Sequence, residues 1–405
     1  MEKVKRVIYI QQHIKNSGYH PPKNLIPNFI TFGFAGLYGR NFKKNNPDYQ
    51  VEVWRLDSSI NEYIDEIIDG VTYRIFPAKG NKLTGIYSFK FIKSLRTLPE
   101  GTLLNVQNLH TLLLYHILIF APKNIIITAH QHGEWSPYFK AETHKGLKKL
   151  YAYLLIFIEK LVINRINHIV IIDKKSIHYL EINIKNLHDR MSMGNTGIDF
   201  SYWNSIEKKE AKKLLGLDTN KKHLFYLGQY YELKAVDQLC DIYMKLKQTD
   251  PDIELVVAGG TPQDKFYKNI IECGAKDFGF ILNSELYKFY SAADVYVCIS
   301  YMPNWVLGIG VAMLESLACG TPVVSNSLNQ LPNTDDIKSI GRAPNNEAEM
   351  INDILYILNH PEEFNKCRNI IKRYEIYYDY KSIQRRMRDI YENLLTTNNT
   401  MKDSK

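Results

Sequence analysis

Cysteine is scarce in this sequence, and the five residues present (240, 273, 298, 319 and 367) form no C-x-x-C pair. Three of them lie in apolar segments, so we expect reduced core thiols in a cytoplasmic protein, and no zinc site. Long apolar runs are missing too. The longest uncharged apolar stretch, residues 150–158, falls well short of the ~20 residues that a membrane-spanning helix needs. The first apolar run ends before Gln11, which predicts an opening strand and not a signal peptide.

Acidic residues are fewer than basic ones, 43 against 51, and the formal net charge is +8. Much of the excess lies between residues 140 and 175, where eight Lys or Arg stand against three acids. Such a patch suits an anionic membrane, a phosphorylated substrate or nucleic acid, but it is also typical of a solvated helix face. No nucleic-acid-binding module surrounds the patch, so we expect no nucleic-acid partner.

A helical pattern within this patch, from about residue 147 to 166, mixes Leu, Ile, Phe and Tyr with lysines at its start. Because nearly its whole circumference is apolar, we expect it to pack inside the first domain. The alternative is a helix that lies on a membrane surface, which would make the protein peripheral on the inner face of the cytoplasmic membrane.

The chain is too long, at 405 residues, for one ordinary core, which predicts two domains of roughly 200 residues. Short β-branched runs alternate with longer helical patterns, and this alternation predicts α/β domains with parallel sheets. We place the first domain at residues 1–200 and the second at 201–377. The predicted strands are residues 4–10, 51–56, 71–76, 103–107, 125–129, 169–173, 224–227, 254–258, 277–281, 295–300 and 322–325.

The most informative segment is residues 295–326, which read as an apolar strand, a glycine turn, a helix with one acid, and a second apolar strand. Such a unit presents free backbone N–H groups at the helix start, where a phosphate can bind. Glu315 lies about one and a half turns further along and can reach a hydroxyl beside that phosphate, as on a ribose. The pattern indicates a nucleotide diphosphate ligand.

The same segment, GIGVAMLESLACGTPVV, resembles the signature of the family-4 retaining glycosyltransferases, E-G-F-G-x-x-x-x-E-A-x-A-x-G-x-P-V-V. The first acid of that signature is replaced by Leu307, and we expect Asn304 to take over its contact with the sugar hydroxyls. The matching positions are Gly308, Gly310, Glu315, Ala318, Gly320, Pro322, Val323 and Val324.

A second stretch, LFYLGQYYELKAVDQL from residue 224, resembles the donor-binding motif of that family, Y-x-G-R-x-x-x-x-K-G-x-D-x-L. Gly228 and Lys234 match, whereas Gln229 replaces the arginine and Ala235 the second glycine. The resemblance implies that Lys234 neutralises the donor diphosphate in place of a metal, with less help than usual because Gln229 carries no charge. Gly259, after the next strand, resembles the family's glycine-rich turn.

The resemblance implies the GT-B fold, in which two doubly wound Rossmann-like domains face each other across a cleft. It also implies that the last helix, residues 378–398, packs back on the first domain. The amides of Gly308, Gly310 and Val311 and the side chain of Glu315 would then bind the donor.

His130 follows a predicted strand of the first domain, in the T-x-H pattern at which the family commonly has a histidine close to the transferred sugar. The alternatives are a structural histidine, or a metal site in which His130, His132 and Glu134 share one face of an extended strand. We favour the sugar contact on this resemblance, and we disfavour the metal site because Gly133 interrupts the extended geometry. Residues 250–252, Asp-Pro-Asp, imitate a metal motif of another glycosyltransferase architecture, but their place before a strand predicts a turn.

The resemblance therefore implies a retaining, metal-independent glycosyltransferase without a cofactor, with His130, Lys234 and Glu315 at its centre. The donor would be a UDP-, GDP- or ADP-sugar. The acceptor would be a glycan or a lipid-linked molecule in surface polysaccharide or glycoconjugate synthesis. Leu307 and Gln229 leave open a catalytically silent GT-B protein that binds a nucleotide sugar or partners an active transferase. Epimerases and phosphorylases share this layout, but these motifs favour neither.

Overall fold

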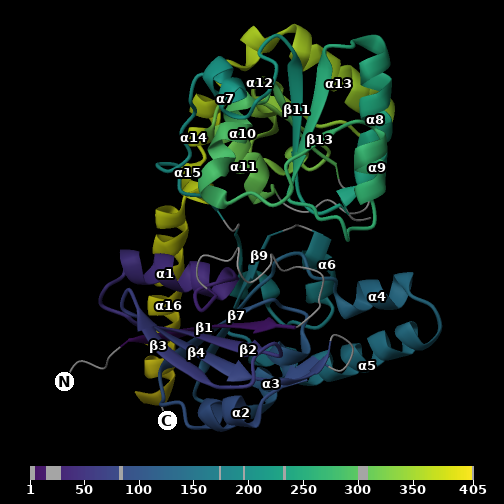
Figure 1. Ribbon diagram of the computed structural model, residues 1–405. Coiled ribbons are helices and arrows are strands. Elements are labelled where there is room, and N and C mark those ends of the chain that lie inside the picture. Colours follow the sequence, from purple (N-terminus) through teal and green to yellow (C-terminus); the bar gives the residue numbers. More distant parts are fainter. Residues whose placement is uncertain are drawn as a thin grey trace. The chain divides into compact units, whose positions relative to one another are not determined.

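The computed structural model describes residues 5–14, 29–81, 85–172, 175–194, 197–230, 234–299 and 309–403. The chain divides into two compact units. Unit 1 comprises Met1–Gly194 and Ile383–Lys405, and unit 2 comprises Asn195–Ser382. Each is an α/β unit in which strands alternate with helices (Figure 1). No helix among the described residues is long and apolar enough to cross a membrane.

Unit 1 is built on an eight-stranded sheet in the order β10-β9-β8-β7-β1-β2-β4-β3. All neighbours are parallel except β3 and β4. The antiparallel pair was not predicted, and it closes through Asp69 and Gly70, both at positive φ as a tight hairpin turn requires. The strands are β1 (Arg6–His13), β2 (Gln50–Asp57), β3 (Ile64–Ile68), β4 (Val71–Pro77), β7 (Thr102–Gln107), β8 (Ile126–His130), β9 (His168–Ile171) and β10 (Met191–Met193), with a separate ribbon of β5 (Lys79–Asn81) and β6 (Gly85–Tyr87).

Both faces of this sheet are buried, because successive residues of its central strands enter two different cores. On one face Ile8 and Ile10 pack with α2 (Phe89–Arg96) and α3 (Leu112–Phe120). On the other, Val7 and Tyr9 pack with α1 (Phe34–Asn45) and α16 (Tyr380–Asp403). Helix α16 contributes one apolar residue per turn to this core: Ile383, Met387 and Tyr391. The remaining helices are α4 (Pro137–Thr143), α5 (Gly146–Val162) and α6 (Lys175–Glu181).

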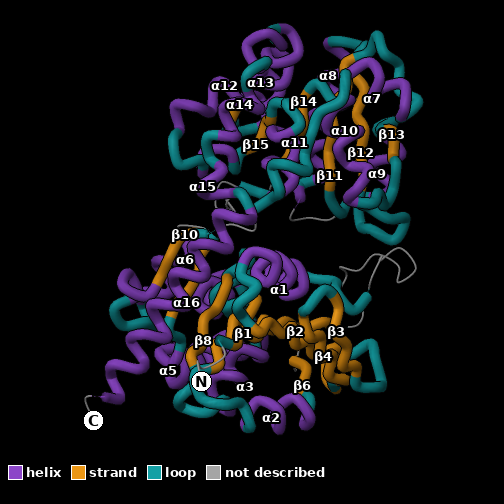
Figure 2. The backbone as a smooth tube through the Cα atoms, turned by 90° about the vertical axis from the view of Figure 1, so that its left-hand side faces the viewer, coloured by secondary structure: helices purple, strands orange, loops and turns teal. Residues whose placement is uncertain are grey.

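Unit 2 holds a six-stranded, wholly parallel sheet in the order β13-β12-β11-β14-β15-β16. Its strands are also buried on both faces, since Phe225 enters one core while Leu224 and Tyr226 enter the other. Figure 2 shows helices on both sides of these strands. The strands are β11 (Lys222–Leu227), β12 (Ile253–Ala258), β13 (Lys276–Asp277), β14 (Val295–Cys298), β15 (Val323–Ser325) and β16 (Gly341–Arg342). The helices are α7 (Lys208–Leu214), α8 (Val236–Thr249), α9 (Tyr267–Glu272), α10 (Leu286–Ala292), α11 (Val311–Ala318), α12 (Ile337–Ile340), α13 (Glu347–Asn359), α14 (Cys367–Lys372) and α15 (Glu375–Tyr378).

The structure corrects two details of the sequence analysis. The predicted strand 277–281 is wrong in length, because the Gly279 N–H donates to Asp277 Oδ1 at 2.9 Å and this local turn ends β13 at Asp277. The helix at 147–166 is not surrounded by protein: α5 buries one face and exposes the other. The Asp-Pro-Asp segment is the expected turn, in which Asp252 N–H donates to Asp250 Oδ1 at 3.0 Å.

Candidate functional site

The candidate donor site lies at the carboxyl edge of the unit 2 sheet, where the turns after β11 and β12 meet. Gly228 N–H donates to the Ala258 carbonyl at 2.9 Å, and Gly259 N–H donates to the Gly279 carbonyl at 2.7 Å. Gly259 has φ +93°, and a Cβ added there would lie 3.1 Å from Gly228 N. A side chain at residue 259 would therefore meet backbone, so the two turns approach each other only because the residue is glycine.

Tyr230 holds these turns together and was not singled out by the sequence analysis. Its N–H donates to Asp264 Oδ2 at 3.0 Å, and its hydroxyl donates to Asp277 Oδ1 at 2.6 Å. Its ring fills the space beside Gly260, where an added Cβ would lie 2.2 Å from it. The sequence signal for this role is a tyrosine directly after a predicted strand and glycine turn. Asp264 and Asp277 are far away in sequence, so only the fold reveals their contact with it.

Lys234 lies just before α8 and is half-buried. Burial raises the pKa of the Cys298 thiol at the end of β14, and the positive charge of Lys234 opposes that rise. Within the described residues no carboxylate forms an ion pair with Lys234. Ala235, where the family pattern has glycine, adopts the left-handed conformation with φ +46°. The turn therefore keeps the geometry that favours glycine without having one.

The neighbouring Gln229 contributes its backbone to the same turn, because its carbonyl accepts a hydrogen bond from the Tyr226 hydroxyl at 3.0 Å. The Gly228 turn is tight as well: a Cβ added to Gly228 would lie 2.7 Å from that hydroxyl oxygen.

Helix α11 begins at the same sheet edge and presents an uncapped amino end. Its N-cap residue, Gly310, is exposed and has no side chain that could cap the helix, and the first turn carries no acid. Val311 is the first helical residue. The N–H groups of a first helical turn have no partner within the helix, and the helix dipole adds partial positive charge there. The end of α11 therefore suits an anion.

Glu315 lies on the inner side of α11 and is buried. Its Oε2 accepts a hydrogen bond from the Tyr290 hydroxyl of α10 at 2.8 Å. Burial raises the pKa of the Glu315 carboxyl to about 7, although the Tyr290 bond opposes the rise. At neutral pH this group can either donate or accept a hydrogen bond, as binding a sugar hydroxyl requires. Asn304, Leu307 and Gly308 lie outside the described residues.

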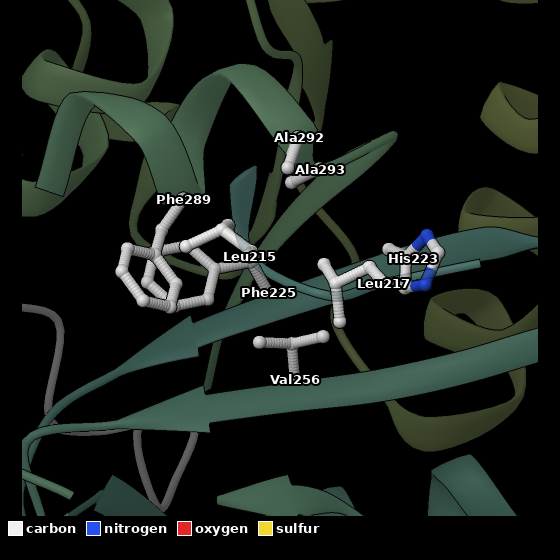
Figure 3. A pocket seen from close by; sticks show the side chains of 8 residues that line it. All are labelled: Leu215, Leu217, His223, Phe225, Val256, Phe289, Ala292 and Ala293. Atoms are coloured by element: carbon white, nitrogen blue, oxygen red, sulfur yellow. The ribbon is translucent and has the colours of Figure 1, made fainter. Parts of the chain in front are cut away.

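A gap in the core of unit 2 is a poor candidate for the site. It is small and almost wholly apolar, and it lies between β11, β12, α10 and the segment after α7 (Figure 3). The polar side chain nearest to it, His223, directs its Nε2 to Glu254 at 3.3 Å. The residues that line it are Leu215, Leu217, His223, Phe225, Val256, Phe289, Ala292 and Ala293. Apart from His223, this lining offers no polar side chain for a nucleotide.

In unit 1 the carboxyl edge of the sheet is built from side chains. His130 ends β8 and is buried, its ring lies 4.6 Å from that of His132 in a stacked arrangement, and its Nε2 lies 3.5 Å from the Tyr38 hydroxyl. Burial and the neighbouring His132 lower the pKa of His130 far below its ordinary value, so its imidazole is neutral. His130 reaches a ligand only as a neutral hydrogen-bonding group, and its contact with a sugar stays a prediction.

The ring of His132 is fixed in its orientation more firmly than that of His130. Its ring also stacks on Phe34 at 4.2 Å, and its Nε2 lies 2.7 Å from Gln107 Oε1. Glu134 folds back on its own loop, accepting from His132 N–H at 2.7 Å and from the Asn108 amide. The Nε2 atom of His132 and both carboxyl oxygens of Glu134 are thus directed to other residues. Among the described residues no three His, Cys, Asp or Glu are grouped to hold a metal ion.

Comparison with known proteins identifies unit 2. Residues 207–374 match the family model described as glycosyl transferases group 1. This matched segment makes up most of unit 2, and we call it the group 1 domain. This group 1 domain contains Gly228, Gln229, Lys234, Gly259 and the start of α11.

Curated relatives match only part of the chain. D-inositol 3-phosphate glycosyltransferase of Mycolicibacterium vanbaalenii is 28% identical over 163 residues, which are 35% of this chain and 34% of the relative. Alpha-monoglucosyldiacylglycerol synthase of Streptococcus pneumoniae is 27% identical over 204 residues, 48% of this chain and 44% of the relative. The matched parts thus span less than half of these relatives.

Solved structures match nearly the whole chain and show its fold. Sucrose-phosphate synthase from Thermosynechococcus elongatus superposes with a TM-score of 0.68 at 16% identity, over 97% of this chain and 100% of that one. Anabaena HepE, solved in complex with UDP-glucose, gives 0.65 at 14% identity, over 96% and 99%. The group 1 domain and unit 1 together have the GT-B fold.

Proposed function

We propose that this protein is a retaining, metal-independent glycosyltransferase that uses a UDP-, GDP- or ADP-sugar. The observation that carries the proposal is the meeting of the Gly228 and Gly259 turns, Lys234 and the uncapped end of α11 at one edge of a group 1 domain. Backbone amides and one ammonium suit a diphosphate, whose charge grows as the sugar departs. Anabaena HepE, a structural relative, was solved with UDP and UDP-glucose, which supports this donor class.

In the proposed reaction the bond between the anomeric carbon and the donor phosphate oxygen breaks, while the acceptor hydroxyl bonds to the same face of that carbon. The acceptor proton passes to a phosphate oxygen of the leaving group, so the enzyme needs no nucleophile of its own. Lys234 and the amides of Gly310 and Val311 stabilise the leaving diphosphate. Lys234 supplies most of the positive charge, because Gln229 stands where the family has arginine.

Glu315 is proposed to bind the donor ribose. Tyr290 fixes one carboxyl oxygen of Glu315, and the other remains for ribose hydroxyls. Gly259 and Gly308 belong to the same proposed donor site, with Asn304 close to the sugar in place of the acid that Leu307 lacks. His130 is the proposed sugar contact from unit 1.

The proposed acceptor is a glycan or a lipid-linked molecule of a surface polysaccharide or glycoconjugate. One sequence relative is a synthase of alpha-monoglucosyldiacylglycerol, and one structural relative, WaaG, takes part in lipopolysaccharide biosynthesis. Both names support an acceptor that resides at a membrane. We therefore propose a cytoplasmic protein that contacts the anionic inner face of the membrane through residues 140–175.

Titration calorimetry with UDP, GDP and ADP tests the donor site. We expect one nucleotide to bind, and Lys234→Ala to weaken its binding about tenfold or more, since a hydrogen bond to a charged group contributes about 1.5–3 kcal/mol. Lys338→Ala, which removes an exposed lysine of α12 in the same unit, should change nothing. If none of the three nucleotides binds, or if Lys234→Ala binds as the wild type does, the donor site is wrong.

The second candidate is a silent GT-B protein, favoured by Gln229 and Leu307 in place of two charged family residues. It predicts nucleotide binding without turnover. Measuring nucleotide release from sugar donors with glycan and lipid-linked acceptors separates the candidates, and Gln229→Arg should restore release if charge at the diphosphate is what is missing.

A further inference from the structure

One helix on the outside of unit 1 leaves a continuous apolar face uncovered. Figures 1 and 2 both show α5 at the periphery of its unit. Its inward face is packed, with Leu155 buried and with Ala152 and Ile156 in a small cluster with Ala141 of α4. Its outward face carries six large apolar side chains that are between 52% and 84% exposed. We call these the α5 stripe: Leu147, Leu150, Tyr153, Leu154, Phe157 and Leu161.

The spacing of these residues makes the stripe continuous. Steps of three and four residues keep side chains on one side of a helix, and 17 residues span about 25 Å. Single exposed apolar residues are normal on protein surfaces, but a stripe of six on one helix leaves a large hydrophobic area in contact with water. This is the reverse of the fully packed helix that the sequence predicted.

The exposed charges of α5 and its N-cap residue are all of one sign. Lys145, the residue directly before the helix, and Lys148, Lys149 and Lys160 within it are exposed. The one acid of the helix, Glu159, is buried and accepts from the Tyr115 hydroxyl at 2.5 Å, so it does not reach this surface. An apolar stripe with lysines beside it is complementary to a partner with an apolar interior and an anionic surface.

We propose that α5 lies in the surface of an anionic lipid bilayer, with the stripe at the boundary between headgroups and acyl chains and the lysines on lipid phosphates. The inference rests on the membrane contact proposed above for residues 140–175 and assigns that contact to one face of one helix. A second copy of this chain fits the surface less well, because two lysine-bearing stripes and two net charges of +8 repel each other.

Co-sedimentation of the full chain with vesicles tests the proposal. We expect binding to an equimolar mixture of phosphatidylcholine and phosphatidylglycerol, and at least about tenfold weaker binding to phosphatidylcholine alone, because each lysine near an anionic surface adds to the attraction. Raising the salt to about 1 M, where the Debye length is about 3 Å, should remove most of that difference.

Two triple variants divide the apolar and the electrostatic contribution. Leu150→Ser with Leu154→Ser and Phe157→Ser should abolish binding to both kinds of vesicle. Lys148→Gln with Lys149→Gln and Lys160→Gln should lower binding to the anionic vesicles at least about tenfold and leave phosphatidylcholine binding unchanged. The matched controls alter exposed residues elsewhere and should bind as the wild type does: Ile67→Ser, and Lys209→Gln with Lys213→Gln and Lys366→Gln.

Three outcomes would overturn the inference: no binding to anionic vesicles, equal binding with and without anionic lipid, or triple variants that bind as the wild type does. A concentration-dependent dimer in sedimentation velocity that the serine variant abolishes would assign the stripe to a second copy instead. Circular dichroism and nucleotide titration on the same variants report folding and the donor site separately. Loss of nucleotide binding with intact vesicle binding would therefore count against the proposed transferase and not against the stripe.

Discussion

The carboxyl edges of the two sheets differ in the chemical groups that form them. In unit 2 the edge consists of glycine turns, a helix end and one half-buried lysine, and Tyr230 joins the turns through Asp264 and Asp277. In unit 1 the edge consists of side chains stacked and hydrogen-bonded to one another, with His132 between Phe34 and His130. Backbone amides suit the diphosphate that the proposed UDP-, GDP- and ADP-sugar donors share, whereas a side-chain surface can differ with the ligand.

The largest effect that tests this comparison should come from Gly259→Ala. The new Cβ would lie 3.1 Å from Gly228 N at a residue with φ +93°. We expect a loss of about 3–4 kcal/mol in the free energy of unfolding, from backbone strain plus the close contact, and loss of nucleotide binding. Denaturant unfolding measures the free energy of unfolding, and titration calorimetry measures nucleotide binding.

Gly274→Ala is the matched control. Gly274 has a similar φ of +77°, but nothing lies within 4 Å of an added Cβ. It should cost only the conformational penalty, about 1 kcal/mol. We call the carboxyl edge of the unit 2 sheet, where the turns after β11 and β12 lie, the donor edge. If the two substitutions lowered the free energy of unfolding equally, the turns of the donor edge would not depend on their close approach.

The next effect concerns the buried carboxyl of unit 2. Burial raises the pKa of Glu315 from 4.5 to about 7, so the folded state binds this proton more tightly than the unfolded state between those pH values. Stability should therefore fall as the pH rises from about 4.5 to about 7, by about 3 kcal/mol in total, and stay low above that. Glu315→Gln should remove this pH dependence and raise the stability at pH 8, while weakening nucleotide binding.

Tyr290→Phe checks the cause of this pH dependence. The Tyr290 hydroxyl bonds to Glu315 Oε2 and lowers its pKa, so its removal should shift the midpoint of the stability change to higher pH. A Glu315→Gln variant that keeps the slope of the wild type would show that another group titrates there.

A smaller effect is expected at the unit 1 edge. His132→Phe keeps an aromatic ring between Phe34 and His130 but leaves Gln107 Oε1 without its partner at 2.7 Å, at a cost of about 1–2 kcal/mol. Nucleotide affinity should not change, because the donor edge belongs to unit 2. Burial lowers the pKa of His132 to about 3, so the wild type should lose stability as the pH falls below about 6.5, and the variant less.

His188→Phe, at an exposed histidine, is the control and should be close to neutral. If His132→Phe weakened nucleotide binding as strongly as Lys234→Ala, nucleotide binding would not be confined to the unit 2 edge as proposed.

The same difference between backbone turns and side-chain contacts explains what the sequence could predict. Glycines, a lysine and a helix start stand at fixed spacing within short segments, so the start of α11 is predicted from local pattern, and the Gly228 turn and Lys234 are predicted from a family resemblance. Their role in donor binding stays a prediction. The role of Tyr230 depends on Asp264 and Asp277, and the stack of His132 on Phe34 joins residues about a hundred positions apart. No local pattern encodes such contacts. The exposure of α5 was mispredicted for a related reason, since apolar content does not show which face finds a partner.

The smallest effect, and the most direct probe of the donor edge, is Ala235→Gly. Ala235 is held at φ +46°, where a Cβ costs about 1–2 kcal/mol, but glycine also loses more chain entropy on folding. We expect a net stabilisation of about 0.5 kcal/mol in denaturant unfolding, and unchanged nucleotide affinity because Lys234 keeps its place. Asp69→Gly is the control in unit 1: its φ of +50° is similar, but aspartate tolerates that conformation better, so the gain should be smaller. If Ala235→Gly destabilised the protein instead, contacts of the alanine methyl would be what stabilises the left-handed turn. The donor edge would then depend on side-chain packing as well as on backbone hydrogen bonds.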